Sequence, residues 1–106
     1  MDTYAIIRDA ILNKRFIRAT YHGLERLMCP HTLGTKKGKP QALFYQFAGQ
    51  SNTGIGPDGD PSNWRCMFLD ELTNVNSSDA HDAWHTAPNH SRPQTCVDTI
   101  DVEVAL

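Results

Sequence analysis

Apolar residues near the N-terminus recur at the spacing of one face of an α-helix. They stand at Ile6, Ile7, Ala10 and Ile11. Asp2 or Thr3 can cap the first turn, and Asn13 ends the pattern. The spacing predicts a short helix that needs a surface to pack on, because isolated helices of this length are marginal in water.

From residue 17 onward the pattern changes to the alternation of a β-strand. Polar and apolar residues alternate up to Tyr21, and His22-Gly23 then predicts a tight turn into a second strand. We expect Pro30 to end that second strand, because proline cannot donate to a ladder. The stretch LGTKKGKP, residues 33–40, has the composition of a loop with a basic tip.

The stretch LFYQFAGQS, residues 43–51, begins like a buried strand and ends in amides, a glycine and a hydroxyl. Its polar end marks either a strand that runs into solvent or the floor of a binding site. Residues 52–63 are rich in glycine and proline and predict an excursion between strands. Residues 64–69 then resume the sheet, and residues 70–75 form a helical turn or a bent continuation.

The C-terminal third is more irregular. Residues 77–85 carry a helix-start signal at Ser78 or Asp79 and predict two helical turns. Residues 99–106 alternate apolar side chains with acidic ones, which predicts a half-buried strand that closes or flanks the sheet.

These elements together predict a mainly β fold of the α+β kind. We expect a short N-terminal helix and a small, strongly curved antiparallel barrel of the SH3-like or Sm-like type. Residues 1–75 would form this core. Residues 76–106 would form an acidic C-terminal extension, packed on the same domain and ending in a strand. At 106 residues the chain is long enough for one modest hydrophobic core.

The charge of the chain is divided between its two halves. Residues 1–50 carry eight Lys or Arg against three acidic residues, whereas residues 51–106 carry two Arg against nine acidic residues. This division can create a basic surface that attracts phosphate, although the net charge is −2. Alternatively, the two halves fold together and their charges interleave.

The cysteines and the N-terminus bear on the compartment. Cys29, Cys66 and Cys96 are an odd, widely spaced set, which favours buried thiols in a reducing interior over a disulfide framework. No apolar run approaches the roughly 20 residues that span a bilayer, and Asp2 stands where a secretory signal would carry positive charge. We therefore expect a cytoplasmic protein with no membrane association.

Residues 6–75, roughly two thirds of the chain, resemble the WYL domain family. The shared pattern is an aromatic-ended strand, a turn into Arg and then Pro, a glycine-bearing hairpin, a Leu-rich strand and an Arg-x-x-Phe segment before Asp-x-hydrophobic. Here these features are Tyr21, Arg26, Pro30, Gly38, residues 43–46, Arg65, Phe68, Asp70 and Leu72. At the tripeptide that names the family this chain has Gln41-Ala42-Leu43. The resemblance implies a stand-alone regulatory barrel that binds nucleic acid or a nucleotide-like ligand and acts on a partner.

Candidate binding residues follow from the strands and from this resemblance. Arg26 can fork onto a phosphate or a base edge, or it can pair with Asp70 or Glu71 across the sheet. Arg65 beside Trp64 combines charge with stacking, or it is a solvated strand residue beside a core Trp. The other candidates are aromatic, amide and imidazole side chains, each of which can instead be structural: Tyr21, His31, Tyr45, Gln46 and Gln50.

Catalytic and metal signatures are weak in the sequence. His81 and His85 would share one face of a helix near Asp82 and His90, but no fourth ligand is specified. The sequence has no phosphate-binding glycine loop and no Gly-x-Ser-x-Gly elbow. We expect no enzyme activity, no cofactor and no metal.

Two functions remain open at this stage. The first is a non-catalytic module that binds single-stranded nucleic acid or a nucleotide-like ligand through basic and aromatic barrel residues. The alternative is a protein-interaction or homodimerisation module that uses the C-terminal strand, since a strand with alternating apolar residues is a ready edge for pairing.

Overall fold

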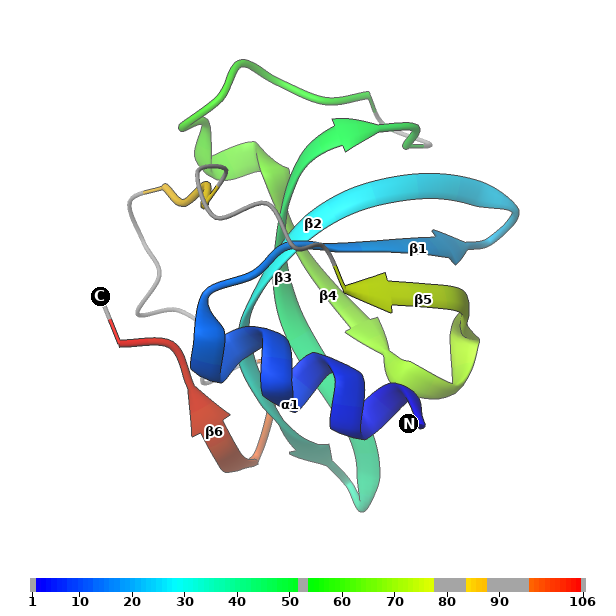
Figure 1. Cartoon of the computed structure of the whole chain (residues 1–106), viewed down its shortest axis with the longest axis vertical. Helices are drawn as coiled ribbons and strands as arrows, with labels where there is room; N and C mark the ends of the chain where they lie inside the picture. The colour runs from blue at the N-terminus through cyan, green and yellow to red at the C-terminus, as the bar shows by residue number, and fades with distance from the viewer. Residues whose placement is uncertain (1, 52–53, 78–83, 88–95, 106) are drawn as a thin grey trace.

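The first helix begins and ends where its sequence pattern predicts (Figure 1). The structure is a computed structural model that describes residues 2–51, 54–77, 84–87 and 96–105. Helix α1 spans Thr3–Asn13, and the Asp2 carboxylate accepts a hydrogen bond from the Ala5 N–H at 2.8 Å. Ile7, Ala10 and Ile11 are buried, so the predicted apolar face is the face that packs.

The strands form an antiparallel sheet. They are β1 (Ile17–Tyr21), β2 (Leu24–Lys36), β3 (Lys39–Gly49), β4 (Trp64–Phe68), β5 (Leu72–Ser77) and β6 (Thr99–Glu103). The strand order is β4-β3-β2-β1-β5, and β6 pairs with β2 outside this path. Short 3-10 helices, η1 (Pro61–Asn63) and η2 (Leu69–Glu71), precede β4 and β5. The fold is therefore mainly antiparallel β with one short N-terminal helix, as the sequence predicts at this level.

Two hairpins turn on a residue pair with left-handed backbone. In the first turn His22 has φ 52° and Gly23 has φ 76°, which confirms the predicted turn. In the second, Lys37 has φ 51° and Gly38 has φ 81°. The loop expected over residues 33–40 is wrong, because β2 runs to Lys36 and β3 starts at Lys39. Only Lys37 and Gly38 form the turn, so a polar composition rich in Lys and Gly did not indicate a longer loop here.

The expectation that Pro30 ends the second strand is also wrong. Strand β1 pairs with β2 up to Met28, and β6 pairs with the same strand from Thr32 onward. Pro30 lies in the interval between them, so its missing N–H interrupts neither pairing. The pairing of β2 with β3 shifts register at this point, between Pro30 and Thr32.

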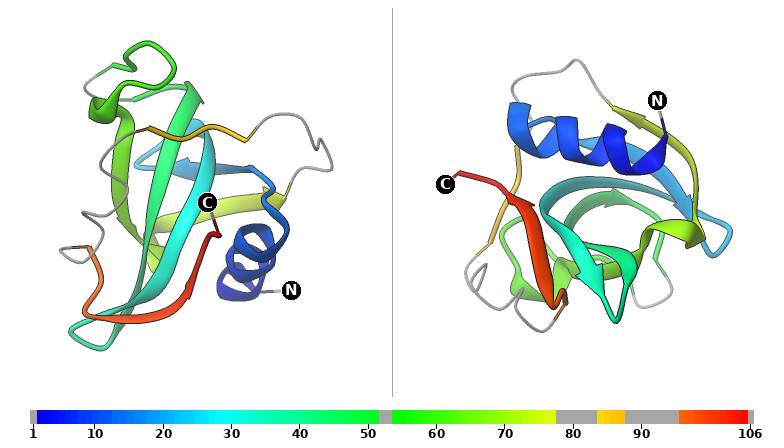
Figure 2. Two further views of the ribbon diagram at one scale, coloured as in Figure 1. Left: turned by 90° about the vertical axis from the view of Figure 1, so that its left-hand side faces the viewer. Right: turned by 90° about the horizontal axis from the view of Figure 1, so that it is seen from below.

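Each face of the sheet has its own apolar cluster. On one face, which we call the helix face, α1 packs on Ile17, Met28 and Phe44 (Figure 2). On the opposite, outer face, Cys29 and Tyr45 pack with Ala87, and Leu43 packs with Cys96 and Val97. Residues 84–87 and 96–97 thus cover part of the outer face.

The last strand, β6, forms as predicted but is only partly buried. Ile100 is 42% exposed, whereas Val104 just after the strand is buried and packs in the helix-face core. At Gly34 the two backbones approach closely: a Cβ there would clash with the Thr99 carbonyl and lie 3.1 Å from the Ile100 Cα. Of the two helical turns expected over residues 77–85, Ser77 ends β5 and residues 84–85 are not helical, while the remaining positions lie outside the described residues.

The cysteine prediction is wrong for two of the three residues. Cys66 and Cys96 form a disulfide between β4 and the segment that leads into β6. The wide spacing hid this pair, because only the folded sheet brings positions 30 residues apart together. Cys29 remains a buried thiol, and burial raises its pKa to about 12. Within the described residues, no helix has both the length and the apolar character needed to span a bilayer.

The charges of the two halves interleave where the C-terminal segment docks. Lys36 pairs with Asp98 at 3.5 Å. The Asp98 carboxylate also accepts a hydrogen bond from the Lys37 N–H, and this bond lowers the pKa of Asp98. Arg8 pairs with Asp101 at 3.4 Å, and Tyr4 donates a hydrogen bond to the same carboxylate. Two arginines of the sheet, Arg26 and Arg65, take no part in this interleaving.

Candidate anion-binding site

Four of the eight predicted site residues lie on the helix face of the sheet. Each one is paired across the sheet with a residue that belongs to the core of that face or packs against it. The pairs are Tyr21 with Leu72, Arg26 with Ala19, Gln46 with Met28, and Arg65 with Phe44. Because directly opposite side chains point to the same face, the four polar side chains continue the core of the helix face.

Arg26 is almost completely buried and has no acidic partner among the described residues. Its side chain is 3% exposed. Its Nη1 donates to Gln46 Oε1 at 3.3 Å, its Nη2 donates to the Tyr21 carbonyl at 3.5 Å, and its Nε has no hydrogen-bond partner. The guanidinium carbon lies 5.1 Å from the centre of the Tyr21 ring. Among the described residues, no carboxylate lies within ion-pair distance of Arg26.

Glu71, one of the two carboxylates considered as partners for Arg26, is engaged elsewhere. Glu71 accepts a hydrogen bond from the Tyr21 hydroxyl at 3.2 Å and lies 3.7 Å from His22 Nε2. Burial first, and then the Glu71 charge, raise the pKa of Tyr21. Burial lowers the pKa of Arg26, but a guanidinium still stays charged at neutral pH. A buried positive charge therefore sits at the edge of the core.

Arg65 adds a second guanidinium and also organises the loop before β4. Its Nη1 donates to the Ser62 carbonyl at 2.6 Å, and its Nη2 donates to the Gly54 carbonyl at 3.1 Å. Burial lowers the pKa of Arg65, and the Arg26 charge lowers it further. Arg65 is paired with Phe44, and Arg26 contacts Gln46 two residues along β3 on the same face; we call the two guanidinium groups the arginine pair.

Gln46 positions Arg26. Its side chain is fully buried, its Oε1 accepts from Arg26, and its Nε2 donates to the carbonyls of Ala48 and Gln50 at 3.1 and 2.8 Å. The amide is thus fully used inside the protein. Gln50 is exposed just beyond β3, whereas Gln46 is buried, so these two candidate residues do not share a surface. The polar end of LFYQFAGQS therefore lies against Arg26, through the Gln46 amide and the Gly49 backbone.

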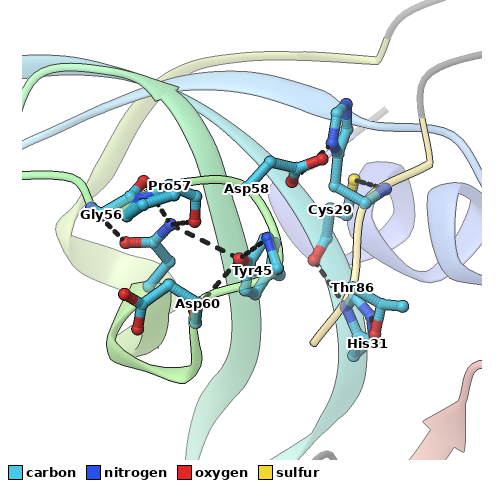
Figure 3. Close-up of polar contacts among 11 residues, drawn as sticks. Cys29, His31, Tyr45, Gly56, Pro57, Asp58, Asp60 and Thr86 are labelled. Carbon is cyan, nitrogen blue, oxygen red and sulfur yellow. Dashed lines mark hydrogen bonds and ion pairs between the residues drawn. The ribbon is translucent and has the colours of Figure 1, made fainter. Parts of the chain in front are cut away.

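Tyr45 lies on the outer face, opposite Trp64, and its hydroxyl supports a loop (Figure 3). The Tyr45 hydroxyl accepts from the Gly59 N–H at 2.8 Å and donates to the Asp60 carbonyl at 3.1 Å. The rings of Tyr45 and Trp64 meet edge to face at 5.1 Å. Tyr45 thus fixes the glycine-rich loop, and neither ring faces the arginine pair.

His31 is a buried structural residue of the same outer face. Its Nδ1 lies 2.8 Å from the Cys29 carbonyl and its Nε2 lies 3.0 Å from Thr86 Oγ1 (Figure 3). Its ring packs between Trp64 and Trp84 at 4.7 and 4.8 Å. The eight predicted residues are therefore not one site: the structure brings together Tyr21, Arg26, Gln46 and Arg65, and places His31, Tyr45 and Trp64 on the other side of the sheet.

The sequence pattern does not predict Asn63 as the residue that holds the glycine-rich loop in place. Asn63 is fully buried, donates from Nδ2 to the Gly56 carbonyl at 3.1 Å and accepts from the Gly56 N–H at 2.8 Å. The signal was the preceding Asp60-Pro61 pair, since Asp followed by Pro is a common helix start, and Asp60 caps η1. Gly54, Ile55, Gly56 and Ser62 line an open cavity of about 390 Å³ beside Arg65.

The histidine cluster considered for a metal is not seen in the described part of the chain. His85 Nδ1 lies 2.9 Å from Asp58 Oδ1, and its ring stacks on Phe47. His81, Asp82 and His90 lie outside the described residues. Within the described ranges, no group of three metal-binding side chains comes together.

Comparison with known proteins gives no relative for this chain. No family model matches it, and no curated protein or solved structure matches it.

The Tyr45 hydroxyl provides a test of the loop architecture. Replacing Tyr45 with Phe removes the acceptor of the Gly59 N–H and the donor to Asp60 without changing the ring. We expect the free energy of unfolding to fall by about 1–3 kcal/mol. Urea denaturation measures the change, and amide exchange at Gly59 should accelerate. Unchanged exchange at Gly59 would contradict the assigned contact. Tyr4→Phe, which removes an exposed hydroxyl, is the matched control.

Proposed function

We propose that this protein binds an anionic ligand, single-stranded nucleic acid or a nucleotide-like molecule, at the arginine pair. The observation that supports it is the Arg26 guanidinium, which is 3% exposed and has only two long hydrogen bonds, both to neutral acceptors. Burying a charge is costly unless the charge is paired. An anion that enters the site would supply the missing partner, and Arg65 would add a second positive charge.

The surroundings of Arg26 favour a nucleotide over a simple anion. The Tyr21 ring lies under the guanidinium and stacks on the exposed His22 ring at 4.0 Å. Aromatic and imidazole faces are surfaces on which bases stack. We therefore assign phosphate attraction to the arginine pair and base contacts to Tyr21 and His22.

We further propose that the sheet is a small SH3-like or Sm-like barrel of the WYL type, acting as a non-catalytic regulatory module on a partner. The strand order supports this, because the β1–β4 meander is followed by β5, which returns beside β1. In the described residues β4 and β5 remain the two edges of this path. The WYL resemblance stays a hypothesis drawn from the residue pattern.

The compartment remains a proposal. The cytoplasmic location expected from the N-terminus conflicts with the Cys66–Cys96 disulfide, since such bonds persist in oxidising compartments and are rare in the cytosol. We therefore propose an oxidising compartment. Alkylation of thiols during cell lysis in denaturant, which exposes the buried Cys29, followed by mass measurement, decides between the two: three alkylated cysteines would support the cytoplasm.

The binding proposal predicts salt-sensitive association with single-stranded oligonucleotides. We expect the dissociation constant for an internally labelled 12-nucleotide strand to rise steeply with salt, because counterions are released from the phosphates. Fluorescence anisotropy at several salt concentrations measures this, with duplex as a comparison. Arg26→Met should weaken binding about tenfold or more, since a charge-assisted contact is lost.

Arg18→Met is the matched control for Arg26→Met. It also removes one positive charge, but Arg18 is exposed on β1 and lies 3.8 Å from Glu25. Equal weakening by both variants would mean that net charge alone drives association. No binding to any strand at low salt would overturn the proposed function.

A second candidate function rests on β6. Ile100 is 42% exposed on a strand that, among the described residues, pairs only with β2. An exposed apolar residue on such a strand suits pairing with a partner or with a second copy. Light scattering after size exclusion tests the homodimer: a monomer at high concentration, unchanged by Ile100→Ser, would remove that form of the idea.

A further inference from the structure

The charge and burial of the arginine pair limit the kind of phosphate group that it can bind. Resting on the proposed function, we infer that the site recognises a terminal phosphate, the monoester group at a strand end or on a mononucleotide, in preference to the internal phosphodiesters of a chain. Three features support this inference: the number of charges, the enclosure of Arg26 and the hydrogen bonds that Arg26 lacks.

The charges of the pair match those of a monoester. A phosphate monoester carries about −1.5 to −2 charges at neutral pH and three acceptor oxygens, whereas a phosphodiester carries one charge. Arg65 is paired with Phe44, and Arg26 donates to Gln46, two residues along β3 on the same face. No ion pair in the described part of the chain joins either arginine to an acid. Two positive charges on one face without acidic partners are best balanced by a dianion.

The burial of Arg26 disfavours an internal phosphodiester, because the nucleic-acid strand would have to continue on both sides of the bound phosphate. Its guanidinium lies over the Tyr21 ring and donates to the Gln46 amide, and only 3% of the residue reaches solvent. The Gly49 backbone closes in as well: a Cβ on Gly49 would lie 2.8 Å from the Arg26 Cα. A diester must leave room for the chain on both sides of its phosphorus, whereas a terminal phosphate enters with one substituent pointing outward.

The hydrogen bonds of Arg26 leave donors for such a group. Its Nε has no partner, and its bonds to Gln46 and to the Tyr21 carbonyl are long, at 3.3 and 3.5 Å. Guanidinium groups bind phosphate oxygens with two parallel N–H donors. Oxygens of a terminal phosphate would therefore engage Nε and displace a weak neutral contact.

The test compares three internally labelled strands of one sequence, with a 5′-phosphate, with a 3′-phosphate, or with hydroxyls at both ends. We expect at least one phosphorylated strand to bind about tenfold or more tightly than the hydroxyl strand. Adenosine monophosphate should compete for the phosphorylated strand, while the cyclic 3′,5′ diester should compete about tenfold less well.

Two variants and three outcomes decide the inference. Arg26→Met should abolish the end preference, and Arg18→Met should keep it. Equal, salt-sensitive binding of all three strands would overturn the terminal-phosphate inference while leaving the proposed function in place. Absence of binding by every strand and by adenosine monophosphate would overturn both.

Discussion

Loss of the Cys66–Cys96 disulfide is expected to lower the free energy of unfolding by about 3–4 kcal/mol. The bond joins cysteines 30 residues apart and so closes a long loop, which restricts the unfolded chain. It also fixes β4, an edge of the main path of the sheet, to the segment that leads into β6. The cost should be the same whether the bond is reduced or replaced by Cys66→Ser with Cys96→Ser.

Chemical denaturation with and without a dithiol reductant measures this effect. Cys29 is the internal control, because it is buried and its raised pKa keeps it as an unreactive thiol in the folded protein. In denaturant without reductant the chain should show one reactive thiol. Three reactive thiols, or equal stability of the oxidised protein and the double variant, would contradict the disulfide.

Replacing Arg26 with Met is expected to raise the free energy of unfolding by about 1–3 kcal/mol while it weakens ligand binding. The substitution keeps a long side chain in the same space and removes a buried charge that no acid in the described structure neutralises. The gain is limited because the Gln46 Oε1 loses its donor. A residue that costs stability in the free protein is typical of a binding site.

Thermal and urea unfolding of Arg26→Met, Arg26→Lys and the unmodified protein measure this effect. Lysine keeps the charge but loses the planar fork, so we expect no stabilisation from Arg26→Lys. If Arg26→Met instead loses 2 kcal/mol or more, as removal of a structural arginine would, Arg26 has a structural role and the argument for an anion fails.

Local chemistry made part of the fold predictable. The 3.6-residue period fixed α1, the His22-Gly23 pair fixed the first hairpin, and the alternation after residue 99 revealed β6. Pro30 does not end β2, because proline is tolerated where one side of a strand is unpaired: it is paired with Phe44 of β3 and lies between the segments that pair with β1 and β6. This pairing is tertiary information, as the interval between β1 and β6 shows.

The site was predictable only in part. The sequence predicts Arg26 and Arg65 as candidates because they are arginines on strands. That their side chains share one face depends on the pairing register of the strands, which cannot be read from the sequence. Tyr45 and Gln46 are adjacent and so point to opposite faces, yet both were assigned to one surface. The Cys66–Cys96 pair depends on the path of a C-terminal segment whose pattern is irregular.

Gly34 gives a way to recognise relatives of this protein. Any side chain at that position would collide with the backbone at Thr99 and Ile100, so docking of β6 on β2 requires glycine there. In a related chain with the same sheet, glycine at this position would indicate a docked C-terminal strand, and a larger residue would indicate that the strand is missing or placed elsewhere. The residue at this one position thus distinguishes related chains in which β6 can dock on β2 from those in which it cannot.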